Sequence, residues 1–100
     1  MAIFVNEKNK VVVQGATGHQ GVFHIGEMLN FGTQVVAGVT PGKAGQNVHN
    51  VPIFNSVIDA VNETKADTSL ILVPARFAKD AVFEALDAGI KTVITIVTVL

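Results

Sequence analysis

With 100 residues, 49% of them hydrophobic, and a net charge of −1, the chain is expected to fold as one compact domain. It has no cysteine, which excludes disulfides and thiolate metal sites, and its three histidines lack the tight spacing of metal ligands. It has neither Tyr nor Trp and no excess of basic residues, so we expect no nucleic acid as partner. No apolar run approaches the roughly 20 residues that span a bilayer, so we expect a soluble, cytoplasmic protein with no membrane as partner.

Along the chain, apolar runs alternate with helical patterns, which is typical of a parallel sheet with crossover helices. The expected strands are 10–14, 33–39, 51–54, 69–73 and 92–99, and the expected helices are 19–30, 57–64 (capped by Asn55 or Ser56) and 76–88. Right-handed crossovers then predict a single Rossmann-like α/β domain, doubly wound, whose ligand crevice lies at the carboxyl ends of the strands.

Each expected helix has an apolar side that should pack on the sheet, following the helical period. The residues expected to be buried are Val22, Ile25 and Leu29 in the first helix, Val57, Ile58 and Val61 in the second, and Phe77, Ala81 and Ala85 in the third.

A glycine-rich turn, Gln14-Gly15-Ala16-Thr17-Gly18-His19-Gln20-Gly21, joins the first expected strand to the first expected helix. The spacing G-x-x-G-x-x-G at a helix start gathers unpaired backbone N–H groups and the positive helix end at one point. Such a point suits a diphosphate, although glycines also mark ordinary tight turns. The flanking strand and helix favour the phosphate interpretation.

The segment after the second expected strand bears on which phosphate ligand would bind. NAD-binding units usually carry an acidic residue there, but no Asp or Glu occurs between Glu27 and Asp59. Lys43 stands in that region instead, as the only Lys or Arg between Lys10 and Lys65. A cation at this place suits a second phosphate on the ribose, as in NADP or coenzyme A (CoA). A solvated loop lysine is the alternative.

Several segments, in order and without a gap, resemble the α-subunit of succinyl-CoA synthetase (succinate–CoA ligase). They are Val12-Val13-Gln14-Gly15-Ala16-Thr17-Gly18-His19-Gln20-Gly21-Val22-Phe23-His24, Gly38-Val39-Thr40-Pro41-Gly42-Lys43-Ala44-Gly45, Val51-Pro52-Ile53-Phe54-Asn55, Val73-Pro74-Ala75-Arg76-Phe77-Ala78-Lys79-Asp80-Ala81 and Glu84-Ala85-Leu86-Asp87-Ala88-Gly89-Ile90-Lys91. The resemblance implies that residues 1–100 form a CoA-binding domain.

The resemblance also implies site residues. Thr17, Gly18, His19 and Gln20 would hold the CoA phosphates, and Lys43 would contact the nucleotide part. His19 departs from the small or polar residue usual there, and would either place positive charge by a phosphate or cap the helix. The expected topology brings further residues to the same edge of the sheet: Gly15, Val39, Val73, Pro74 and Ile96.

Two family features have no counterpart in these 100 residues. Thr98 stands where the family has a glutamate, and the phosphorylated histidine lies in a second domain, so His19, His24 and His49 are not expected to be catalytic. In the family, a β-subunit grasps ATP or GTP. We therefore expect the chain to bind CoA and present its thiol without being catalytically complete.

Two other functions remain open from the sequence. A Rossmann-like domain could instead sense NAD(P) or another nucleotide, because the fold does not fix the ligand. A non-binding assembly module is the other alternative. Residues 92–100 form a β-prone run without charge that is expected at a sheet edge. This predicts self-association, either through the last strand or through the apolar surface that the family's second domain would otherwise cover.

Overall fold

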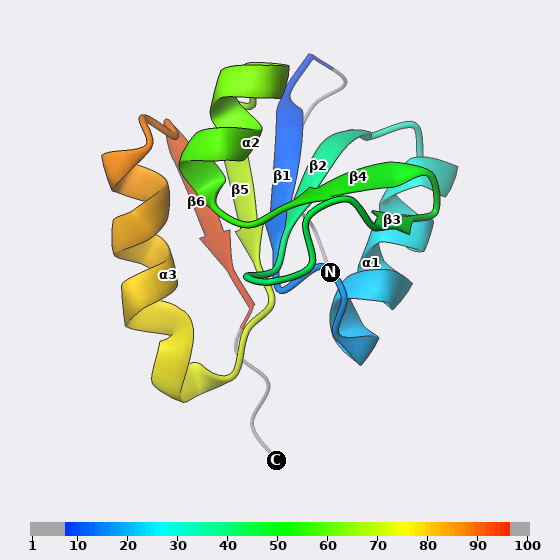
Figure 1. Ribbon diagram of the computed structural model, residues 1–100. Helices are drawn as coiled ribbons and strands as arrows, with labels where there is room; N and C mark the ends of the chain where they lie inside the picture. The colour runs from blue at the N-terminus through cyan, green and yellow to red at the C-terminus, as the bar shows by residue number, and fades with distance from the viewer. Residues whose placement is uncertain (1–7, 97–100) are drawn as a thin grey trace.

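The computed structural model describes residues 8–96 and has a six-stranded sheet with three helices (Figure 1). The elements are β1 (Lys10–Gln14), α1 (His19–Asn30), β2 (Gln34–Val39), β3 (Asn47–Val48), β4 (Val51–Phe54), α2 (Val57–Thr64), β5 (Thr68–Ile71), α3 (Ala75–Asp87) and β6 (Thr92–Thr95). The strand order is β3-β4-β2-β1-β5-β6, with every neighbouring pair parallel except β3 and β4. The predicted Rossmann-like α/β architecture is confirmed.

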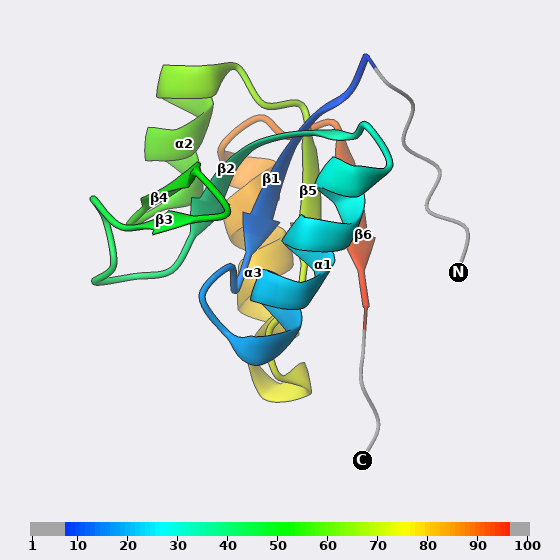
Figure 2. The same ribbon diagram turned by 90° about the vertical axis from the view of Figure 1, so that its right-hand side faces the viewer.

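The helices cover the sheet from both sides, α1 on one face and α2 with α3 on the other (Figures 1 and 2). The alternation of side chains along β1 explains this division, because successive residues of a strand point to opposite faces. Val11 and Val13 pack in one cluster with Ile25 of α1, whereas Val12 packs in a second cluster with Val57 of α2. A continuous valine run is what a strand buried on both faces requires.

The buried side of α1 differs from the prediction. Val22 is 37% exposed and Leu29 36% exposed, while Gly21, Ile25 and Met28 are buried. The cause is the close approach of Gly21 to the preceding turn, where a Cβ would overlap the Gly15 carbonyl oxygen. This contact turns the helix so that Gly21 and not Val22 faces the sheet.

The buried sides of α2 and α3 are also partly corrected. Ile58 and Phe77 are 46% and 49% exposed, whereas Val57, Ala81 and Ala85 are buried as predicted and Val61 is half-buried. Ala60 takes the place expected for Ile58, because α2 and α3 pack against each other as well as on the sheet. Small side chains allow that close packing.

Residues 40–50, which lie between two of the expected strands, contain the short strand β3, which pairs with β4. Its turn places His49 and Asn50 at positive φ, and the His49 ring donates from Nε2 to the Val22 carbonyl oxygen at 3.1 Å. Two residues give no periodicity, so the sequence offered no signal for this strand. The hairpin therefore rests on α1 through His49.

Two strands end earlier than predicted, and both ends lie near the expected crevice. β5 ends at Ile71, so Leu72, Val73 and Pro74 form a loop, and Pro74 is the N-cap of α3. β6 ends at Thr95, and it lies at the sheet edge as predicted. The expected continuation to residue 99 and the position Thr98 fall outside the described residues. Within residues 8–96, no helix is long and apolar enough to cross a membrane.

Candidate functional site

The carboxyl ends of β1 and β5 mark the centre of the sheet. These strands are neighbours, yet the chain leaves β1 into α1 on one face and leaves β5 into α3 on the other (Figures 1 and 2). The two connections therefore diverge and leave a crevice between their first residues. In open α/β sheets this switch point is where ligands bind.

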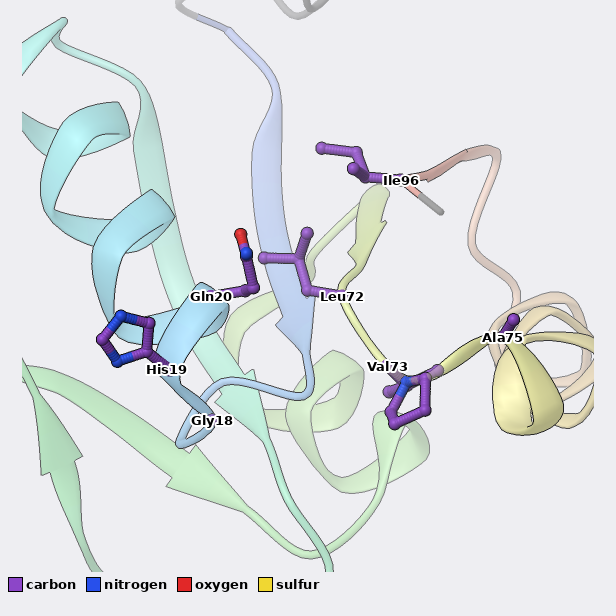
Figure 3. Close-up of a pocket in the computed structure, with 8 residues that line it drawn as sticks. Gly18, His19, Gln20, Leu72, Val73, Ala75 and Ile96 are labelled. Carbon is purple, nitrogen blue, oxygen red and sulfur yellow. The ribbon is translucent and has the colours of Figure 1, made fainter. Parts of the chain in front are cut away.

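A cavity of about 460 Å³ lies at this switch point, and we call it the first cavity. Figure 3 shows Gln20, Leu72 and Ile96 arranged around it, with Gly18 on one side and Ala75 on the other. Its lining combines the start of α1, the loop before α3 and the end of β6. The full set is Gly18, His19, Gln20, Leu72, Val73, Pro74, Ala75 and Ile96.

Two helices begin at the first cavity without a capping side chain. The N-cap of α1 is Gly18, and the first hydrogen bond within that helix runs from the Val22 N–H to the Gly18 carbonyl oxygen at 3.0 Å. The N-cap of α3 is Pro74, and the first hydrogen bond of that helix runs from the Phe77 N–H to the Pro74 carbonyl oxygen at 2.8 Å. Neither helix has an acidic residue in its first turn. Both starts thus present unused N–H donors and a positive helix end.

The start of α2 shows the contrast. Its N-cap Ser56 accepts a hydrogen bond from the Asp59 N–H at 3.3 Å, and the Glu84 carboxylate accepts one from the Val57 N–H at 2.8 Å. Asp59 adds a negative charge to its first turn. The first N–H groups of α2 therefore find hydrogen-bond acceptors within the protein. Among the described helices, the two that lack a side-chain cap, α1 and α3, are the two that begin at the cavity.

The glycine loop, residues 15–18, contains one crowded glycine and one glycine with open space beside it. Gly15 has φ +84°, and a Cβ there would lie 2.6 Å from the Leu72 carbonyl oxygen, so no other residue fits. Gly18 is different, because its backbone is extended and a Cβ would have only the Gly15 carbonyl oxygen within 4 Å, at 3.6 Å. The space beside Gly18 is therefore open to a ligand.

A second cavity of about 340 Å³ lies beside the first and shares Val73 and Pro74 with it. Apolar groups form most of its wall, and two carboxylates of α3 complete it. The residues that line it are Gln14, Gly15, Val39, Pro41, Val73, Pro74, Phe77, Asp80, Ala81 and Glu84.

The predicted site residues mostly meet at these two cavities. Gly18, His19, Gln20 and Ile96 line the first, Gly15 and Val39 line the second, and Val73 and Pro74 line both. The imidazole of His19 points away from Val73 (Figure 3) and makes no hydrogen bond within residues 8–96. His19 therefore does not cap α1, which was one of the two roles that the sequence left open for it.

Thr17 and Lys43 line neither cavity. The Thr17 N–H and hydroxyl both donate to the Thr40 Oγ1, at 3.3 Å and 3.1 Å. Lys43 is exposed on the loop that starts at Thr40, and its N–H donates to the Thr40 carbonyl oxygen at 3.1 Å. Asn55 braces this loop by accepting from the Gly42 and Ala44 N–H groups at 2.9 Å and 3.2 Å. Thr40 thus joins the loop of Lys43 to the glycine loop.

Eight residues that line the cavities were not among the predicted site residues: Gln14, Pro41, Leu72, Ala75, Phe77, Asp80, Ala81 and Glu84. Phe77 was assigned to the core because its spacing from Ala81 and Ala85 fits one helix face. A usable signal was the position of Pro74 at the strand tip, since the first turn of a helix that starts there must face the crevice.

The buried side chains of Gln14 and Ser69 form hydrogen bonds next to the second cavity. The Ser69 hydroxyl donates to the Gln14 Oε1 at 2.5 Å, and the Gln14 amide donates to the Ala81 carbonyl oxygen at 3.0 Å. Both side chains are buried. Because buried polar groups are costly when unpaired, these bonds fix α3 against β1.

Asp67 has a pKa below the ordinary value of an aspartate. Burial alone would raise the pKa of Asp67, but hydrogen bonds from the Thr68 hydroxyl, the Asn9 amide and the Lys10 N–H hold that pKa below its ordinary value. Asp67 precedes β5, at the amino ends of the strands. Asp67 therefore lies at the opposite end of the strands from the cavities, and its role is structural.

Fold and site together define a Rossmann-like α/β domain with cavities at the carboxyl ends of its strands. The family model described as CoA binding domain matches residues 6–99, and the chain belongs to this family. It is a CoA-binding domain homologous to succinate–CoA ligase α-subunits.

Curated relatives share high identity with the chain. It is 57% identical over 96 residues to the ADP-forming succinate–CoA ligase subunit alpha 1 of Archaeoglobus fulgidus, which covers 96% of the chain and 33% of the relative. It is 60% identical to the corresponding subunit alpha of Aquifex aeolicus, with 96% and 32% covered. It is 52% identical to the ADP-forming sulfoacetate-CoA ligase subunit SauD of Bilophila wadsworthia, with 96% and 33% covered. The chain spans about a third of the length of these relatives.

Solved structures confirm the fold. A Rex-family repressor, RSP, superposes with a TM-score of 0.76 at 17% identity, over 92% of this chain and 46% of that one. A conserved hypothetical protein from Pyrococcus furiosus superposes with a TM-score of 0.73 at 21% identity, over 88% of this chain and 74% of that one. RSP has been solved with β-NAD⁺ and operator DNA, but at this identity the likeness concerns the fold alone.

Proposed function

We propose that the domain binds CoA across both cavities, with the diphosphate at the start of α1. The observation that carries this proposal is the pair of uncapped helix starts, α1 and α3, at the first cavity. Their free N–H groups and positive ends attract an anion. The open space beside Gly18 lets a phosphate approach the backbone closely.

The two cavities suit the two arms of CoA. The second has a mainly apolar wall that includes Val39, Pro41 and Phe77, which favours a flat adenine ring. The first continues past Leu72 to Ile96, and these apolar side chains suit the pantetheine arm. The diphosphate would then cross between the cavities at Gly15 and Gly18. Gln20 supplies a side-chain amide to the same ligand.

Lys43 is proposed to contact the 3′-phosphate on the ribose of CoA. It is exposed, and its loop is tied through Thr40 to the glycine loop. Its long side chain can extend from this loop to a phosphate that lies outside the second cavity. This contact would distinguish CoA from dephospho-CoA, and a lysine in place of an acidic residue disfavours NAD.

We propose that the domain is part of the α-subunit of an acid–CoA ligase, which pairs with a β-subunit that binds ATP or GTP. CoA would be a substrate whose thiol this domain presents to an activated acid. The relatives include ligases named for succinate and for sulfoacetate, although each matches this domain over about a third of its length. The choice of acid is therefore expected to lie outside residues 1–100.

Calorimetric titration of the purified chain with CoA, dephospho-CoA and NADPH tests the binding proposal. We expect saturable binding of one CoA per chain, weaker binding of dephospho-CoA, and displacement of NADPH by CoA. Binding of NADPH without binding of CoA would instead support the nucleotide-sensing alternative. A folded chain that binds none of the three would leave the assembly role.

Self-association is a second proposal, supported by the edge position of β6. Among residues 8–96, this strand pairs only with β5, so its outer edge is free to pair with β6 of a second copy. Val97 and Val99 lie outside the described residues, and lysine at both should favour the monomer if the run continues the edge. Sedimentation velocity over a wide concentration range measures the association. A monomer at every concentration would exclude it.

A further inference from the structure

Two carboxylates lie in the wall of a cavity that we assign to a polyanionic ligand. Asp80 and Glu84 are one helical turn apart on α3, and both line the second cavity. Phosphates are repelled by such a wall. The part of the ligand that meets α3 must therefore be uncharged and able to donate hydrogen bonds, because an ionised carboxylate only accepts.

Glu84 is held in place, and Asp80 is not. The Glu84 Oε2 accepts the Val57 N–H at 2.8 Å, which fixes the carboxylate between α2 and α3. Its other oxygen, Oε1, has no hydrogen-bond partner within residues 8–96. Asp80 makes no hydrogen bond or ion pair in the same part of the chain. Glu84 thus presents a pre-oriented acceptor, which costs little ordering when a donor arrives.

We propose that Glu84 selects the base of the bound nucleotide by accepting a hydrogen bond from the 6-amino group of adenine. Adenine carries a donor at this position, whereas hypoxanthine and guanine carry a keto oxygen. Placing that oxygen against the Glu84 carboxylate would bring two acceptors together and leave both unpaired. The role of Glu84 rests on the proposed binding of adenine in the second cavity.

A merely structural role for Glu84, as the cap of α2, predicts a different result. Glu84→Gln keeps an oxygen that can accept the Val57 N–H, and it turns the other end of the group into an NH₂ donor. The cap is retained while the chemistry facing the cavity is inverted. Asp80→Asn is the matched control, because it removes the same charge from the same cavity wall at a residue that is not held by α2.

The experiment is calorimetric titration of the full chain with CoA and with the CoA analogue in which hypoxanthine replaces adenine. We expect the wild type to bind CoA about tenfold or more tightly than the analogue, since a site built for a donor rejects a ligand that lacks it. Glu84→Gln should lower this ratio by about tenfold or invert it, from the exchange of acceptor for donor. Asp80→Asn should keep the wild-type ratio within about twofold.

Several results would overturn the proposal. They are equal wild-type affinity for the two ligands, a ratio unchanged in Glu84→Gln, and a ratio that changes only in Asp80→Asn. The wild-type comparison needs no variant, so it remains decisive if Glu84→Gln does not fold. Binding of CoA without discrimination refutes only the role of Glu84, whereas a folded wild type that binds neither ligand refutes the proposed function as well.

Discussion

The hydroxyl groups of Thr17 and Thr40 lie 3.1 Å apart and form a hydrogen bond between two loops that follow neighbouring strands. Thr40 Oγ1 also accepts the Thr17 N–H at 3.3 Å. The glycine loop and the loop of Lys43 are therefore fixed relative to each other before any ligand binds. A ligand that touches both loops would find its two contacts already spaced.

Replacing Thr40 by Val should weaken CoA binding with little change of shape. Valine has nearly the same volume but offers no acceptor, so the Thr17 N–H and hydroxyl lose their partner. At about 1 kcal/mol for each net hydrogen bond, affinity should fall roughly three- to thirtyfold. Calorimetry measures the change, and Thr40→Ser, which keeps the hydroxyl, is the control. Equal affinities for the two variants would show that this hydroxyl does not organise the site.

Lys43→Ala should weaken CoA more than it weakens dephospho-CoA. A charge-assisted contact to the 3′-phosphate is worth about 1.5 kcal/mol or more, so the CoA affinity should fall about tenfold. The loss should shrink in high salt, because exposed charges are screened. Lys91→Ala removes the same charge from an exposed residue at the amino end of β6 and should change neither affinity. Equal losses for both ligands in Lys43→Ala would remove this role.

The sequence was sufficient for the elements whose signals are local. The bounds of β1 and α1 match the prediction, because a valine run and a glycine turn with an amphipathic segment specify them directly. The glycine loop was likewise located from its glycine spacing together with the strand and the amphipathic segment that flank it. What the sequence could not supply was the rotation of α1, since that depends on the contact between Gly21 and the Gly15 carbonyl.

The second cavity depends on relationships that a linear pattern does not show. Phe77 reads as a core residue by its period, yet the helix that carries it starts at the crevice and turns it outward. Glu84 becomes notable only when α2 and α3 pack together and the Val57 N–H reaches its carboxylate. Hydrophobic spacing predicts which side of a helix is apolar, but the packing partner decides which residues it covers.

The pH dependence of stability should contain a contribution from Asp67. The pKa of Asp67 is lower in the folded state than its unfolded value of 3.8, so the ionised carboxylate stabilises the fold at pH values above 3.8. This contribution is lost as the pH falls through the lower pKa of the folded state. Asp67→Asn should therefore be less stable than the wild type at pH 7, and the difference should shrink below about pH 4. Urea unfolding at several pH values measures it. A difference that does not vary with pH would mean that the charge is not involved.

Gly18→Ala and Gly21→Ala should separate ligand binding from folding. A Cβ at Gly18 meets only the Gly15 carbonyl oxygen at 3.6 Å, an ordinary contact, and the backbone there is extended, so the domain should keep its stability. The methyl group instead enters the space proposed for the diphosphate. Crowding of this kind costs about 1–3 kcal/mol, so CoA affinity should fall roughly five- to hundredfold.

At Gly21 the same methyl group would overlap the carbonyl oxygens of Gly15 and Ala16, which are backbone atoms that cannot move aside. Gly21→Ala should therefore lower the free energy of unfolding by about 1–3 kcal/mol or more. Urea unfolding and CoA titration of both variants give the comparison. Normal CoA affinity in Gly18→Ala would place the diphosphate away from Gly18, and normal stability in Gly21→Ala would mean that α1 does not depend on its close approach to the glycine loop.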